Sequence, residues 1–196
     1  MSFDTASGTL SALGSSWQQG GVSLTVTPCD AAGVVYTPNL FGATEPESPE
    51  NGDVWLKQAE DAPWSYRDAL KLYSTAGGWQ NILLNYCRVT CKGLGEAFKA
   101  GDTVTLTGIP SVVKNAYSSD FSGDVVVDDV AGDSVILSIA PDIESVLYYG
   151  TCVVTGQSVV WTAMDGKTTQ TFDGPFPDVT AQRRVPDLDW LTEHNN

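Results

Sequence analysis

Four aspartates gather in the stretch "DVVVDDVAGDS" (124–134): Asp124, Asp128, Asp129 and Asp133. Carboxylate oxygens are ligands that Ca²⁺ prefers, but a calcium loop needs several of them at a tight, defined spacing. The EF-hand pattern does not fit, because its glycine and its terminal glutamate are misplaced here. The apolar runs "VVV" and "VIL" on either side instead predict a β-hairpin with "DDVAGD" as its polar turn. We therefore expect no metal ligands in this stretch.

The cysteines form a second group that could bind a metal or form disulfides. They are Cys29, Cys87, Cys91 and Cys152. Cys87 and Cys91 are four residues apart, which on a strand separates them too far to bridge each other. A metal site needs more ligands nearby, and the only histidine, His194, lies close to the end of the sequence. Buried free thiols are favoured over a disulfide, and a disulfide over a metal site.

Other patterns that support catalysis are weak. His194 stands beside no serine or cysteine motif, so no nucleophilic triad is indicated. The stretch "GLGEAF" (93–98) lacks the spacing and the following helix of a phosphate-binding loop. A carboxylate pair for glycoside hydrolysis could be drawn from any two of 24 acidic residues, and nothing orients a proton donor. We expect no catalytic residues and no cofactor-binding residues, and hence no enzyme.

Aromatic side chains offer one further kind of site. Six Trp and seven Tyr are enough for a sugar-stacking platform, because their rings present flat apolar faces. Most of these rings are needed, however, to fill the cores of small β units. Carbohydrate binding is therefore an alternative expectation that depends on how many ring faces are exposed.

The composition of the chain limits the classes of partner that it could bind. The chain of 196 residues has 24 acidic and 10 basic residues, for a net charge of −14. So little positive charge makes tight binding to nucleic acid an unfavoured function. No apolar run approaches the length of a membrane-spanning helix, and the first ten residues do not resemble a signal peptide. With 42% hydrophobic residues the chain can bury a core.

Short alternating segments dominate the pattern and predict an all-β protein. Gly, Pro and Asp stand at nearly every boundary between segments. Only "GEAFKAG" (95–101) suggests a helical turn. We expect strands at 22–29, 52–57, 68–74, 77–84, 86–93, 102–108, 123–130, 133–140, 150–156, 158–164 and 168–174.

The same pattern predicts how the chain is divided. The proline-rich stretch 37–52 reads as a linker or long loop, because proline cannot donate in a ladder. A softer boundary falls near Asn85. We expect two small antiparallel units, a hairpin module within 1–85 and a small β-barrel or sandwich at 86–180. Residues 181–196 read as a connector to a region that follows.

Three stretches resemble a group of bacteriophage tail and virion structural proteins, of tail-hub or nozzle-like type and associated with β-propellers. In "NGDVWLKQAEDAPWSYRDALKLYSTAGGWQNI" (51–82), Trp55 and Trp79 should lie on neighbouring strands, near Tyr73. The last stretch, "RRVPDLDWLTEHNN" (183–196), matches the group's Arg-x-Val-Pro-Asp-x-Asp-aromatic pattern. Between them, "YCRVTCKGLGEAFKAGDTVTLTGIP" (86–110) carries the matching residues Gly93, Gly95, Phe98, Gly101, Asp102, Val104 and Gly108.

The resemblance implies a non-enzymatic structural module of a phage tail or virion protein. Its partners would be other virion subunits, including copies of itself, and its location the virion, assembled in the bacterial host cytoplasm. The resemblance also implies that residues near both ends, including Phe3, Val185 and Trp190, belong to an interface with the rest of a larger protein. The alternative is a module on the virion that binds carbohydrate or a host receptor.

Overall fold

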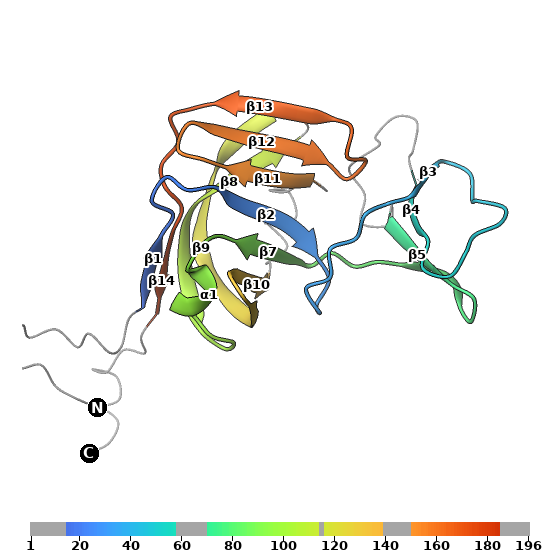
Figure 1. Cartoon of the computed structure of the whole chain (residues 1–196), viewed down its shortest axis with the longest axis horizontal. Helices are drawn as coiled ribbons and strands as arrows, with labels where there is room; N and C mark the ends of the chain where they lie inside the picture. Colours follow the sequence, from blue (N-terminus) through green and yellow to red (C-terminus); the bar gives the residue numbers. More distant parts are fainter. Residues whose placement is uncertain (1–14, 58–69, 114–115, 139–149, 185–196) are drawn as a thin grey trace, which may run out of the picture.

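The computed structural model describes residues 15–57, 70–113, 116–138 and 150–184, and for residues 111–113 and 116–121 it describes the backbone only. Two sheets account for nearly all of the regular structure (Figure 1). The expected all-β class is confirmed, with one large antiparallel sheet and one small separate sheet.

The large sheet has ten strands. Every pairing in it is antiparallel. In spatial order the strands are β1 (Ser16–Gln18), β14 (Thr180–Arg183), β8 (Thr103–Val113), β9 (Ala116–Ala131), β10 (Ser134–Ser138), β7 (Tyr86–Thr90), β2 (Leu24–Cys29), β11 (Gly150–Val154), β12 (Ser158–Ala163) and β13 (Thr169–Asp173).

Alternation of apolar and polar residues builds the core of this sheet. In β12 the inward residues Val159, Trp161 and Ala163 are buried, while the residues between them are partly exposed. Strands β2, β7 and β11 alternate in the same way. The inward residues of all these strands, together with Leu94 of the helical turn α1 (Leu94–Ala97), form one continuous core.

The sheet is open. Strands β1 and β13 stand at its two edges and are not paired with each other, so the expected barrel is not closed. Closure needs a continuous stagger of every strand around an axis. Here β1 has only three residues, too few to meet a five-residue strand along its length.

The small sheet follows the order β3 (Leu40–Gly42), β4 (Val54–Lys57), β5 (Leu70–Ser74) and β6 (Gly78–Asn81). Val54, Leu56, Leu70 and Ile82 form its core. Met164, which follows β12, packs against this core, so the two sheets are in contact. Strand β3 runs parallel to β4, which makes this sheet mixed rather than purely antiparallel.

The sheets do not divide the chain at residue 85, as the expected units 1–85 and 86–180 would require. Strands β1 and β2 belong to the large sheet. Strand β2 pairs with β7, although all four strands of the small sheet lie between them in the sequence. The connector expected at 181–196 likewise begins inside β14. Strands that follow each other in the sequence are usually neighbours in a sheet, but this tendency fails where another unit is inserted between two paired strands.

Candidate functional site

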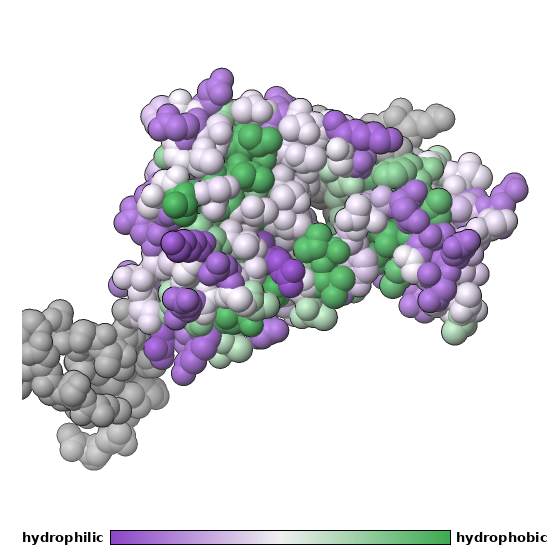
Figure 2. Space-filling view, viewed as in Figure 1, coloured by the Kyte–Doolittle hydropathy of each residue, from purple (hydrophilic) through white to green (hydrophobic). Residues whose placement is uncertain are grey.

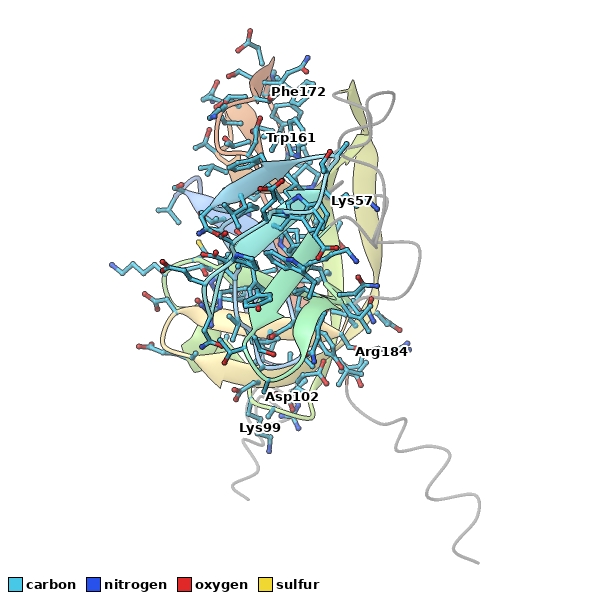
Figure 3. The ribbon with its side chains drawn as sticks, turned by 90° about the vertical axis from the view of Figure 1, so that its right-hand side faces the viewer. Lys57, Lys99, Asp102, Trp161, Phe172 and Arg184 are labelled. Atoms are coloured by element: carbon cyan, nitrogen blue, oxygen red, sulfur yellow. The ribbon has the colours of Figure 1, made fainter. Side chains whose placement is uncertain are left out.

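Two of the three stretches that carry the resemblance, 86–110 and 183–196, meet in the large sheet. Asp102, from the Gly-Asp pair before β8, is buried and forms an ion pair with Arg183 of β14, with 3.0 Å between Arg183 Nε and Asp102 Oδ1. The backbone N–H of Lys99 donates to Asp102 Oδ2 at 3.0 Å. Lys99 and Asp102 lie together at the lower end of the molecule in Figure 3. Asp102 therefore holds the turn before β8 against β14.

A second ion pair, exposed to solvent, joins Asp124 of β9 to Arg184, the residue after β14. Arg184 Nη1 donates to Asp124 Oδ2, and the Thr105 hydroxyl donates to Asp124 Oδ1 at 2.6 Å. The hydrogen bonds from Thr105 and Arg184 hold the pKa of Asp124 below its ordinary value. Because both charges are exposed to solvent, the pair fixes geometry more than it adds stability.

The glycines and apolar residues of the same stretch serve the fold. Gly93, Gly101 and Gly108 all adopt positive φ angles, which favour glycine. Phe98 and Val104 are buried in the main core. Every matching residue in 86–110 therefore has a structural role in a turn, the core or an ion pair.

Gly95 gives the first testable result. A Cβ added there would lie 1.8 Å from the carbonyl oxygen of Gly132, so the β9–β10 turn would have to move. Gly95→Ala should lower stability by about 1–3 kcal/mol, a fall in Tm of roughly 2–12 °C. Gly156→Ala is the control, because a Cβ at Gly156 meets nothing within 4 Å. Equal Tm values for the two variants, measured by calorimetry, would contradict this role of Gly95.

The aspartate hairpin forms as expected but with a shorter turn. Strand β9 continues to Ala131, and the pairing with β10 shifts register between Ile136 and Leu137, leaving Asp128 as the extra residue of a bulge. Asp128 and Asp129 are exposed. Asp133 Oδ1 accepts the backbone N–H of Gly93 at 3.0 Å, which joins the hairpin turn to α1.

We expect calcium to leave the stability of the protein unchanged. Within the described part of the chain, no three potential metal-ligating side chains come together. A ligand specific to the folded state must raise its stability, so Tm in millimolar Ca²⁺ should match Tm in potassium chloride of equal ionic strength. A rise of several degrees with calcium alone, lost in Asp128→Asn, would make this hairpin a cation site.

All four cysteines are buried free thiols, the favoured alternative. Burial raises the pKa of Cys29 to about 11 and that of Cys152 to about 12. Burial also raises the pKa of Cys87 and Cys91. Thiolates are the reactive species, so these thiols are poor nucleophiles and poor metal ligands in the folded protein.

The aromatic residues form a cluster in the small sheet. The Trp55 and Trp79 ring centroids are 5.5 Å apart, and those of Tyr73 and Trp79 are 5.2 Å apart, which confirms the expected grouping of these three rings. Trp55 is buried and donates from Nε1 to the carbonyl of Gly42 at 2.9 Å. Trp161 is fully buried in the large sheet. Neither Trp55 nor Trp161 offers a face for stacking a sugar.

A cavity of about 190 Å³ lies between the large sheet and residues 35–37, which lead toward the small sheet. Three threonines of the large sheet, Thr27, Thr151 and Thr162, lie along it in register on adjacent strands. Tyr36 and Met164 also line it. Ligand pockets usually measure about 300–1,000 Å³, so this one is small. Its described lining holds no carboxylate, amine or imidazole, so those residues offer hydrogen bonds but no acid–base catalyst.

Several expectations fall outside the described residues. They are the expectations for His194, Phe3, Val185 and Trp190. What the structure does show is that the first and last described strands pair directly, with Ser16 opposite Gln182.

Comparisons with known proteins identify no relative. No family model matches the chain, and no curated protein or solved structure does. In the described ranges no helix has the length and apolar character needed to cross a membrane.

The sequence did not reveal the exposed edge of the large sheet at β13. Its segment "TTQTFDG" was predicted as a strand, but nothing in it distinguishes an edge strand from an interior one. Figure 1 shows β13 at the upper limit of the sheet, beyond β12. Four of its five residues are exposed. Among the described strands, β13 therefore pairs with β12 alone.

Proposed function

We propose that this chain is a non-enzymatic structural module of a phage tail or virion protein and that it mediates contacts between subunits of the particle. The observation that carries the proposal is the open edge of the ten-stranded sheet at β13. An edge strand presents unpaired backbone N–H and C=O groups, which are a ready template for a strand of another chain.

The roles of the motif residues support the same proposal. The residues that resemble the phage group, from Gly93 to Gly108, hold turns and core, and none of them lines the cavity. Motif residues that fix turns and the core, rather than lining a pocket, are typical of a structural protein. The hydrophobic patches on the face shown in Figure 2 are small and separated by polar residues, so contacts through a strand edge fit this surface better than a broad apolar interface.

The carbohydrate- or receptor-binding alternative needs exposed ring faces around a cleft. Of the four described tryptophans, Trp55 and Trp161 are buried, and Trp17 and Trp79 are partly buried. These four rings form no exposed stacking platform, so the assembly role has the stronger support.

The direct test is mass spectrometry of purified virions of the phage that encodes this chain. Lys71 and Arg88 delimit a tryptic peptide, residues 72–88, that contains "NILLNYCR". We expect this peptide in intact particles at a level comparable with known structural proteins and resistant to salt washing. Its presence in the lysate but absence from washed particles would overturn the proposal.

A further inference from the structure

The backbone of β13 presents a defined set of hydrogen-bonding groups to solvent. The N–H of Ala163 donates to the carbonyl of Thr168 at 2.8 Å, and that of Gly174 to the carbonyl of Gln157 at 2.7 Å. In an antiparallel pair the bonded positions alternate, so the even-numbered residues of β13 face β12. The N–H and C=O groups of Thr169, Thr171 and Asp173 therefore point away from the sheet.

This edge has few of the usual protections against pairing, since its one charged residue, Asp173, is the last of the strand. Natural edge strands are commonly guarded by lysine, proline or a bulge. Strand β13 contains neither lysine nor proline, and its five pairs with β12 follow without a register shift. Thr169, Thr171 and Asp173 are also exposed through their side chains. The edge is therefore regular, and no strand of the described residues pairs with it.

We propose that β13 pairs antiparallel with β13 of a second copy of this chain, about a two-fold axis at Thr171. Thr171 then lies opposite Thr171 of the other copy, and Thr169 lies opposite Asp173. Every outward N–H and C=O of the three residues gains a partner in this register. The inference rests on the proposed function and deepens it by naming the partner.

The charges of the strand select this register. An axis at Asp173 would place two carboxylates directly opposite each other, which is destabilising, and would put Pro175, which has no N–H, opposite Thr171. An axis at Thr169 would leave Asp173 without a partner. With the axis at Thr171, each Asp173 carboxylate faces a Thr169 hydroxyl, which can donate to it.

The pairing edge is also well placed. Figure 3 shows Phe172 of β13 at the opposite end of the molecule from Asp102. Strand β14, the last described strand in the sequence, lies beside β1 at the other edge of the sheet. Two copies joined through β13 leave both of these strands uncovered.

Net charge predicts how the dimer responds to salt. Each copy carries −14, so the long-range interaction between copies is repulsive. Raising the ionic strength shortens the Debye length, about 8 Å at 0.15 M, and weakens this repulsion. The dimer should therefore tighten as salt is added, the reverse of an interface held by opposite charges.

Disulfide trapping in the full chain tests the register. The four native cysteines are all buried, so an introduced surface cysteine is the most reactive thiol in the folded protein. In Thr171→Cys the two introduced residues would have Cα atoms about 5.5 Å apart, within disulfide range. In the control Thr169→Cys they would be about 13 Å apart, since four residues separate the two positions along the strand. We expect at least about tenfold more covalent dimer from the first variant than from the second.

Equal trapping in the two variants, or none in either, would overturn the proposal. Sedimentation velocity gives a second readout without cysteines. The unmodified chain should sediment as a dimer at high salt, whereas Thr171→Asp, which sets like charges opposite each other, should be monomeric. At low salt and low protein concentration, where both proteins are monomeric, their Tm values should be equal. A monomeric unmodified chain at every salt concentration would overturn the proposal, and detection of the peptide 72–88 in virions would still stand as support for the assembly role.

Discussion

Replacing Trp161 with alanine should lower the free energy of unfolding by about 3–5 kcal/mol. The ring is fully buried on the inner face of β12, opposite Cys152 of β11. It is also tightly enclosed, because a Cβ on Gly150 would lie only 2.0 Å from its Nε1 atom. Removing the indole leaves a cavity that the neighbouring strands cannot fill, and domains have only about 5–15 kcal/mol of stability in total.

Urea denaturation followed by far-ultraviolet circular dichroism measures this loss. Phe41→Ala is the control, because the Phe41 ring is 40% exposed and contacts the Lys167 ammonium at 5.4 Å from the ring centroid. We expect that control to cost about 1 kcal/mol or less, as exposed sites usually do. A Trp161→Ala protein as stable as the Phe41→Ala protein would mean that the ring lies outside the core.

Trp55→Ala should cost a similar amount, about 3–5 kcal/mol, but the loss should concentrate in the small sheet. Trp55 packs on Trp79 and donates a hydrogen bond to Gly42, which fastens β3 to β4. Among the described residues, Trp55 lies outside the buried cluster of Val54, Leu56, Leu70 and Ile82 and packs instead with Tyr73 and Trp79, so its loss would disrupt a second set of contacts in this sheet. Hydrogen exchange should accelerate in β4 and β5 more than in β7.

Trp55→Phe separates the two contributions of this residue. The phenyl ring keeps an aromatic contact with Trp79 but cannot donate to Gly42, so the loss should be clearly smaller than in Trp55→Ala. Unchanged exchange in β4 and β5 after Trp55→Ala would show that the small sheet does not depend on this ring.

Strands with strong alternation were predictable from the sequence. In "VSLTVTPC" Val22, Leu24 and Val26 alternate with polar residues, and β2 follows that period. In "SVVWTAM" the β-branched and aromatic residues indicate a strand, and burial in β12 alternates along it. The strands β1 and β3 have three residues each and give no periodic signal. Strand β3 also lies among prolines, where a loop is the ordinary expectation.

The junction at Asp102 was not predictable from the sequence. Asp102 and Arg183 both belong to motif stretches, but they are far apart in the sequence. Their ion pair forms only because β14 lies beside β8. The same holds for Gly95, whose lack of a side chain matters only because Gly132 approaches it. Local patterns report periodicity and turns, whereas these contacts depend on which strands become neighbours.

The insertion of the small sheet between two paired strands has a consequence for the entropy of the unfolded chain. Strands β2 and β7 are joined by residues 30–85, with Cys29 opposite Tyr86 where the connection begins and ends. Closing so long a loop costs about 3 kcal/mol more than closing a two-residue turn. Tyr36 and Leu84, near the two ends of that loop, both pack on the core of the small sheet. Once the small sheet has formed, those ends are already close together, and the loop that β2 and β7 must close is effectively short. The small sheet thus stabilises the centre of the large sheet through chain entropy as well as through contacts.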